Sequence, residues 1–174
     1  MENLLSKIEG KRISVPAKTI LLEAGSISKN IYFIKSGCAR LWYNNDGLDI
    51  TLQFFMAGQM VSSFDSLLHD APSQYTIETI LPTEIEIYEK NDIFHILNED
   101  SELKNRLIMK VFDVASKYVN LFLSRIKDTP QQRYEKLLME QPEIVAQIPQ
   151  HYIASYLGIT AVSLSRIRAR IIKS

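Results

Sequence analysis

The chain has 174 residues, of which 46% are hydrophobic and 23% are charged, the balance of an ordinary globular protein. This composition excludes wholesale disorder, and the length suits one well-buried core or two small domains. No stretch reaches the roughly 18 uncharged apolar residues of a membrane helix, and the first residues lack a signal-peptide pattern, so we expect a cytoplasmic protein.

The formal net charge of +0 hides an uneven distribution of charge along the chain. Residues 20–100 include twelve acidic and four basic side chains, which gives this segment a net charge of −8. From residue 144 onward there is no acidic residue, and the basic ones are Arg166, Arg168, Arg170 and Lys173. Because nucleic acids are polyanions, we expect any contact with them at the C-terminal end.

Segments rich in β-branched and aromatic residues alternate with turn formers from Arg12 to about Tyr88. One turn, Asp46-Gly47, lies between two apolar segments, and glycine accepts the positive φ of a tight hairpin. Regularly spaced short strands favour an antiparallel sandwich or roll. The single cysteine, Cys38, has no partner for an internal disulfide, and we expect a small buried side chain there. The expected strands cover residues 19–22, 31–34, 39–43, 50–55, 75–79 and 84–88.

A helical periodicity replaces the strand pattern between Ser101 and Lys127. Apolar residues recur there at spacings of three and four, and a second apolar stripe runs beside the first. We expect one stripe to pack on the β-domain and the other on a second copy of the chain. The alternative is a helix folded into its own monomer's core, which we disfavour because little chain remains to cover both stripes. The residues expected at the dimer contact are Leu107, Val111, Val114, Tyr118 and Leu121.

The segment Asp128-Thr129-Pro130 ends the long helix and starts another one. Threonine is a good N-cap, and proline is tolerated as the first helical residue because its missing N–H would have no helical partner there. Further breaks follow at Gln141-Pro142 and Ile148-Pro149. The pattern predicts a small helical unit from about residue 128 onward.

Residues 149–167 have the spacing of a DNA-binding helix-turn-helix. The small Ala154 lies where the two helices touch, and Gly158 takes the left-handed turn four positions later. Thr160 is placed to cap the second helix with its side-chain oxygen. Apolar residues that hold the two helices together follow at suitable spacings: Ile153, Leu157, Ile159, Leu164 and Ile167.

The second helix of this motif is the one that enters the major groove, with its N-terminal end leading. We expect Arg166 to make a bidentate contact with a guanine, and the basic residues after it to meet phosphates or solvent. The alternative is a packed helical hairpin with no role in DNA binding, and the basic second helix argues against it. The candidate DNA-binding residues are Ser163, Ser165, Arg166, Arg168, Arg170 and Lys173.

The order of these parts resembles the Crp/Fnr superfamily over nearly the whole chain, and residues 25–40 are similar to the family's signature of a strand, a glycine turn and an arginine-bearing strand. The resemblance implies an α+β fold: an antiparallel β-roll (double-stranded β-helix) of the cyclic nucleotide-binding kind at 1–98, a dimerisation helix at 99–127 and the helix-turn-helix domain at 128–174. It also implies a homodimer that binds a small effector and a palindromic operator in double-stranded DNA.

The positions that bind cyclic AMP in this superfamily are different here. A Gly-Glu pair for the ribose corresponds to Ser62-Ser63, and an Arg-Ser/Thr pair for the cyclic phosphate corresponds to Ser73-Gln74. No arginine or lysine lies between residues 40 and 90, so no local cation is available for a phosphate. We therefore expect that cyclic nucleotide binding has been lost and that any effector is of another kind.

Two departures concern DNA. The cyclic AMP receptors place an Arg-Glu pair at the start of the recognition helix, where this chain has Ala161-Val162, so the operator sequence should differ. The chain also ends at Ser174, directly after this helix, where many relatives continue into a β-wing. We expect phosphate contacts from such a wing to be missing.

No cofactor is expected. One cysteine cannot hold an iron–sulfur cluster, and the three histidines, His69, His95 and His151, are too scattered to suggest a metal or haem site. An enzyme of the cupin kind needs clustered histidines and carboxylates, whereas the strand region has only His69. The stronger alternative is a sensor or protein-interaction module of the same fold that does not bind DNA. Basic residues confined to the last helix argue against it.

Overall fold

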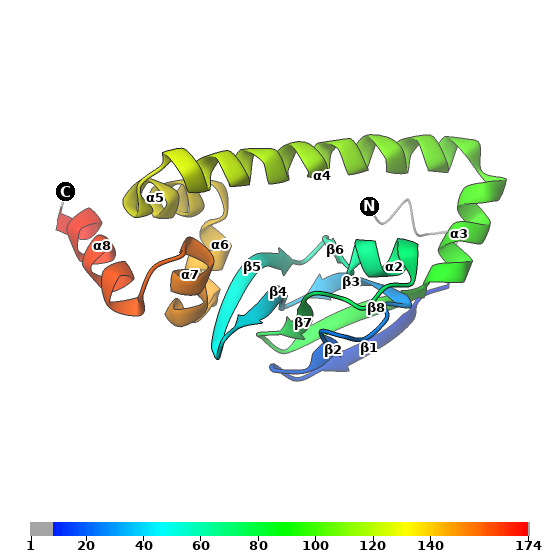
Figure 1. The fold of residues 1–174 in the computed structure, drawn as a ribbon, viewed down its shortest axis with the longest axis horizontal. Helices are drawn as coiled ribbons and strands as arrows, with labels where there is room; N and C mark the ends of the chain where they lie inside the picture. Colours follow the sequence, from blue (N-terminus) through cyan, green and yellow to red (C-terminus); the bar gives the residue numbers. More distant parts are fainter. Residues whose placement is uncertain (1–8, 174) are drawn as a thin grey trace.

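The computed structural model describes residues 9–173 of the chain, with a β-rich part first and helices after it (Figure 1). The strands are β1 (Lys11–Val15), β2 (Ile20–Leu22), β3 (Asn30–Ser36), β4 (Cys38–Asn45), β5 (Leu48–Met56), β6 (Met60–Val61), β7 (Thr76–Thr79) and β8 (Thr83–Glu89). The helices are α2 (Phe64–His69), α3 (Lys90–Glu99), α4 (Ser101–Lys127), α5 (Pro130–Glu140), α6 (Pro142–Gln147), α7 (Gln150–Leu157) and α8 (Ala161–Lys173).

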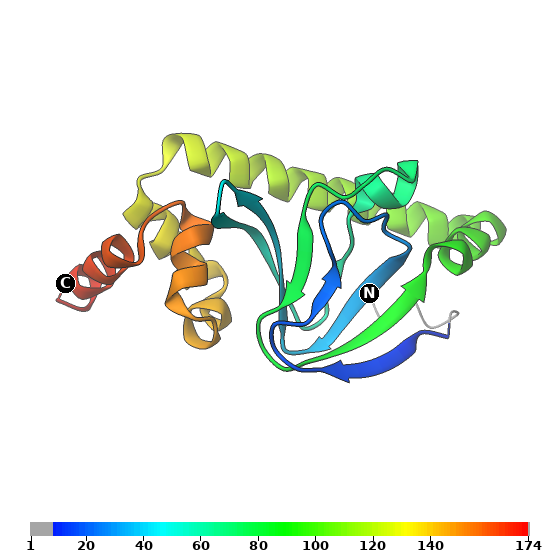
Figure 2. The same ribbon diagram turned by 60° about the horizontal axis from the view of Figure 1, so that its bottom comes forward.

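The strands form two antiparallel sheets of four strands each, in the orders β1-β8-β3-β6 and β2-β7-β4-β5. The sheets face each other (Figure 2), and apolar residues such as Ile34, Ala39 and Ile77 fill the space between them with no exposed surface. The predicted antiparallel roll is therefore confirmed. The Asp46-Gly47 hairpin is also confirmed, because both residues have positive φ angles, 50° and 89°, between the paired strands β4 and β5.

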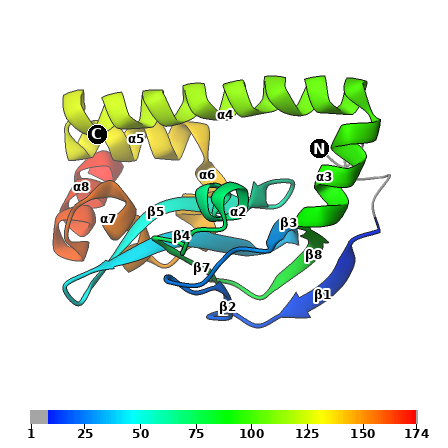
Figure 3. The ribbon, with the colours of Figure 1, turned by 45° about the vertical axis from the view of Figure 1, so that its right-hand side comes forward.

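The long helix α4 begins and ends at the predicted residues. Asp100 caps its start by accepting a hydrogen bond from the backbone N–H of Leu103, at 2.9 Å. The helix passes along one side of the roll, the side on which α2 lies (Figures 1 and 3). None of the helices between residues 9 and 173 combines the length and the apolar composition of a membrane span.

The four C-terminal helices form the small helical unit that the proline breaks predicted. Thr129 and Gln132 make a capping box at the start of α5, where Pro130 is the first helical residue. Buried side chains of α5 to α8 share one apolar cluster with Cys38 and Phe54 at one end of the roll. The helical unit therefore packs directly on the roll. Burial raises the pKa of the Cys38 thiol to about 12, in keeping with the small buried side chain that was expected.

Candidate nucleic-acid interface and effector pocket

Helices α7 and α8 pack as the helix-turn-helix pattern requires. Gly158 ends α7 with a φ of 69°, a left-handed conformation that glycine adopts without a Cβ penalty. The backbone N–H of Ser163 donates to the Thr160 hydroxyl at 3.1 Å, which is the predicted cap of α8. The predicted contacts between the helices are present: Ile159 is half-buried against the cluster that the other side chains form, and those side chains are buried, namely Ile153, Ala154, Leu157, Leu164 and Ile167.

Arg133 of α5 fastens this pair of helices to the end of α4. Its guanidinium donates to the carbonyl of Asp128, directly after α4, at 2.7 Å, and to the carbonyl of Leu157, at the end of α7, at 2.9 Å. Both carbonyls lie at helix ends, where no intrahelical N–H reaches them. One side chain therefore satisfies two helix termini and holds them together.

The candidate DNA-binding residues of α8 differ in exposure. Ser165, Arg166 and Arg170 are exposed, whereas Arg168 is half-buried. Ser163 is also half-buried, and its hydroxyl lies 3.0 Å from that of Thr160, near the cap. Lys173 is the last residue of α8, and its side chain lies outside the described part of the chain.

Neither apolar stripe of α4 is covered along the middle of the helix. Val111, Val114 and Tyr118 are exposed, and Leu107 and Leu121 are half-buried, so the five residues expected at a dimer contact share one accessible face. In the second stripe, Phe112 keeps 62% of its surface exposed. The expectation that one stripe packs on the β-domain is thus not met along this stretch, because the middle of α4 runs beside the roll without burying its side chains in it.

The two predicted pairs of the effector pocket, Ser62-Ser63 and Ser73-Gln74, are each hydrogen-bonded to the segment of residues 25–30. The Ser62 hydroxyl donates to the carbonyl of Asn30 at 2.8 Å, and the backbone N–H of Ser73 donates to the carbonyl of Ser26 at 2.9 Å. The Ser73 hydroxyl donates to the carbonyl of Tyr75 at 2.7 Å. Two of the four candidate side chains, those of Ser62 and Ser73, therefore donate hydrogen bonds to backbone carbonyls.

The remaining two candidates of the effector pocket differ in exposure. Ser63 is buried at the N-cap position of α2, and its side chain makes no capping hydrogen bond there. Gln74 is exposed. Of the four candidates, two hydroxyls are thus bonded to backbone carbonyls, one serine is buried without a capping bond, and the glutamine is exposed.

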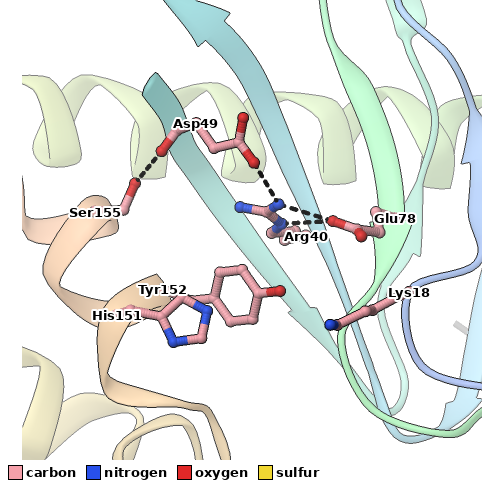
Figure 4. A pocket seen from close by; sticks show the side chains of 7 residues that line it. All are labelled: Lys18, Arg40, Asp49, Glu78, His151, Tyr152 and Ser155. Atoms are coloured by element: carbon pink, nitrogen blue, oxygen red, sulfur yellow. Dashed lines mark hydrogen bonds and ion pairs between the residues drawn. The ribbon is translucent and has the colours of Figure 1, made fainter. Parts of the chain in front are cut away.

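A group of residues that the sequence patterns did not single out lies where α7 meets β5 (Figure 4). Arg40, Asp49 and Glu78 come from the roll, and Tyr152 and Ser155 come from α7, around an open cleft of about 310 Å³. Burial raises the pKa of the Tyr152 phenol, and the nearby Arg40 opposes that rise. The sequence does contain one sign of this group. Positions 152, 155 and 156 form a second stripe on α7, separate from the buried residues that pack in the helix-turn-helix.

Comparison of the whole architecture with solved structures shows which proteins share this fold. FixK2 from Bradyrhizobium japonicum aligns with a TM-score of 0.82 at 16% identity, over 94% of this chain and 85% of that one. CLP from Xanthomonas campestris, described as a c-di-GMP responsive global regulator, aligns with a TM-score of 0.72 at 12% identity, over 99% and 92%. A CooA mutant from Carboxydothermus hydrogenoformans gives 0.73 at 16% identity, over 95% and 77%. The fold is that of Crp/Fnr transcription regulators.

Residues 12–100 match the family of the cyclic nucleotide-binding domain. This match spans the roll, α3 and the residues around them, about half of the chain, and the chain belongs to that family. The predicted resemblance is thereby confirmed. No curated protein matched the sequence.

Proposed function

We propose that the chain is a sequence-specific DNA-binding transcription regulator of the Crp/Fnr type, acting as a homodimer in the cytoplasm. The observation that carries the proposal is the outer face of α8, which presents Arg166 beside small side chains at the end of a fully packed two-helix unit. The proposed domains are the roll at 1–98, the dimerisation helix at 99–127 and the helix-turn-helix domain at 128–174.

The exposed middle of α4 supports the homodimer. Its apolar residues between Leu107 and Leu121 repeat at spacings of four, three, four and three, which is the heptad pattern of two helices that supercoil. A second copy of α4 presents the same stripe, so a two-fold contact is self-complementary. Val111 keeps 58% of its surface exposed in the single chain, and such a contact would cover it.

Each basic residue of α8 has its own proposed role in DNA binding. Arg166 is exposed on the outer face, within reach of base edges in the major groove, where arginine recognises guanine through two hydrogen bonds. Arg168, Arg170 and Lys173 lie further along the helix, and we assign them to phosphates. No acidic residue follows position 143, so nothing in this segment repels the DNA backbone.

We further propose that the roll no longer binds cyclic nucleotides. The hydroxyls of Ser62 and Ser73 are engaged by the protein backbone, and neutral donors compensate a phosphate about half as well as charged ones. Arg40, the last arginine before these serines in the sequence, is paired with Glu78 and Asp49. The net charge of −8 over residues 20–100 opposes an anion as well.

Selection from a pool of random DNA duplexes tests the DNA-binding proposal directly. The full-length protein should enrich a two-fold symmetric sequence with half-sites about one helical turn apart. Arg166→Ala should lose about 1–3 kcal/mol of discrimination at one base pair, whereas Arg170→Ala should mainly reduce the salt dependence of binding. A dimer that enriches no sequence would favour the sensor or protein-interaction module instead.

Calorimetric titration of the full-length protein tests the proposal about the roll. Cyclic AMP and cyclic GMP should give no saturable heat, and the same electrostatic argument applies to c-di-GMP, to which CLP responds. Saturable one-to-one binding of a cyclic mononucleotide at low micromolar concentration would contradict the proposal. In that case backbone amides at the start of α2 would be the groups that bind the phosphate.

A further inference from the structure

Helix α7 has two contact faces, and the helix-turn-helix uses only one of them. Ile153, Ala154 and Leu157 point into the helical core. Tyr152, Ser155 and Tyr156 form a second face, at the i, i+3 and i+4 spacing, that meets β5 and its neighbours in the roll. Its apolar part is the contact of Tyr156 with Phe54 of β5, whose ring centroids are 5.2 Å apart.

The Ser155 hydroxyl completes the hydrogen bonding of β5. This strand lies at the edge of its sheet, where backbone groups have no neighbouring strand. The Ser155 hydroxyl donates to the carbonyl of Asp49 at 2.8 Å and accepts from the backbone N–H of Thr51 at 2.9 Å. Thr51 is fully buried, so its N–H would be left without water or partner if the hydroxyl were removed in place.

Arg40 is held between the roll and α7 (Figure 4). Only 3% of its surface is exposed, and its guanidinium bonds to Glu78 at 2.8 Å and to Asp49 at 3.3 Å. The same guanidinium lies 4.7 Å from the ring centroid of Trp42 and 4.3 Å from that of Tyr152. Cation–π contacts are strongest where water is excluded, and Tyr152 excludes water only while α7 stays on the roll.

We propose that Arg40, Tyr152 and Ser155 form a joint that holds the helix-turn-helix in one orientation on the roll and leaves the outer face of α8 free. The inference rests on the proposed function in one respect, since DNA binding is what that orientation would serve. With the joint closed, Val162 and Arg166 of α8 remain exposed, so the contact presents α8 instead of hiding it. Opening the joint therefore weakens DNA binding, because the orientation must then be fixed on the DNA.

The joint is also connected to the interior of the roll. Arg40 lies in β4 between Ala39 and Leu41, whose side chains belong to the core between the two sheets. Successive side chains of a strand point to opposite faces, so a shift of β4 that accommodates something inside the roll also moves Arg40.

The test compares the full-length wild type with the double variant Tyr152→Ala/Ser155→Ala. Hydrogen exchange over residues 49–53 and the emission of Trp42, the single tryptophan of the chain, report on the joint without DNA. The double variant should exchange faster there and emit at longer wavelength, because the Trp42 ring N–H is buried with no partner in the described part of the chain and becomes hydrated. Affinity for the DNA sequence selected by the wild type should fall about tenfold, with the base preference unchanged.

Two matched controls separate the joint from general damage. Tyr152→Phe keeps the ring over Arg40, and Ser101→Ala removes a hydroxyl from the exposed start of α4, so neither should change exchange, emission or affinity. Tyr152→Leu replaces Tyr152→Ala if the double variant fails to fold.

If hydrogen exchange and Trp42 emission were unchanged in the double variant, the joint would not exist as proposed. If the double variant bound DNA more tightly than the wild type, the joint would not hold α8 in the orientation that favours DNA binding. If the wild type selects no DNA, the proposed function fails. In that case the exchange and emission measurements still decide whether the joint exists.

Discussion

The middle of α4 and the roll-facing side of α7 are two helix faces that do not pack on neighbouring helices of the same chain. The two faces differ in composition. The α4 face is apolar and lies uncovered in the single chain, whereas the α7 face offers two tyrosines and a serine that the roll covers. Polar groups with fixed partners specify one geometry within a chain, while a repeated apolar stripe suits an identical copy. The difference separates contacts made within the chain from the contact proposed between chains.

The largest effect is expected from placing charge in the middle of α4. Val111→Glu combined with Val114→Glu would bury two unpaired carboxylates in the proposed helix pair, at a cost of several kcal/mol, and should give monomers. Sedimentation velocity at micromolar concentration measures this outcome. Asn105→Glu, at an exposed polar position of the same helix, should leave the dimer intact. If the wild type itself sedimented as a monomer, the α4 face would not be a contact between chains, and the contrast with the α7 face would fail.

A phenylalanine on each side of the comparison gives the next effect. Phe54, fully buried beside Tyr156, should cost about 3–5 kcal/mol of unfolding free energy when replaced by alanine, at any protein concentration. Phe112→Ala in α4 should change the unfolding free energy of the monomer by less than about 0.5 kcal/mol, because the side chain is exposed there. Urea denaturation of both variants in the monomeric background separates the two expectations, and equal losses would contradict them.

The connection between α4 and the helical unit should respond more weakly. Thr129→Ala removes the side-chain acceptor of the capping box at the start of α5 and should lower stability by about 1 kcal/mol. Thr129→Ser keeps a hydroxyl at the N-cap and should restore most of the loss. Thermal unfolding followed by circular dichroism checks both variants, and a serine variant as unstable as the alanine one would rule out the cap as the cause.

The smallest effect is a pH dependence on the surface of the roll, away from both helix faces. The hydrogen bond from Arg12 to Glu86, at 2.6 Å, lowers the pKa of that carboxyl below its usual value. Its contribution to stability is therefore fully present above the unfolded-state pKa and is lost as pH falls through the folded-state pKa. Glu86→Gln should flatten the acid side of the curve of stability against pH. An unchanged acid limb in urea titrations between pH 3 and pH 7, which spans roughly the usual carboxyl range, would contradict this.

The elements with strong local signals were predicted from the sequence. The hairpin at Asp46-Gly47, the long helix and the turn at Gly158 each depend on neighbours in the sequence, and each lies where the pattern placed it. The short strands β1 and β6 and the helix α3 were not singled out. β6 has only two residues, and its pairing with β3 comes from tertiary contacts that no local pattern records.

The joint between the roll and α7 could not be predicted in the same way. The Ser155 hydroxyl bonds to backbone groups that are 104 and 106 positions away in the sequence, and Arg40 reaches Tyr152 across a similar separation. A buried arginine among aromatic rings looks like an ordinary strand residue until the fold is known. The middle of α4 differs from the joint in this respect. Its two apolar stripes were predicted from the sequence, but the sequence did not indicate that neither stripe would be covered by the roll.

The attachment of Arg133 to both Asp128 and Leu157 fixes the rotational phase of the helical unit about the axis of α4. In the proposed dimer, the position of each α8 is then fixed relative to its own α4. The distance between the two α8 helices, and with it the half-site spacing on DNA, is therefore set by how the two α4 helices pair. One residue inserted into α4 would rotate everything after it by about 100° about the helix axis. Because the helical unit also shares a buried cluster with Cys38 and Phe54 of the roll, such an insertion would break that contact as well, and the two α8 helices would no longer match major grooves about 34 Å apart on one side of the duplex.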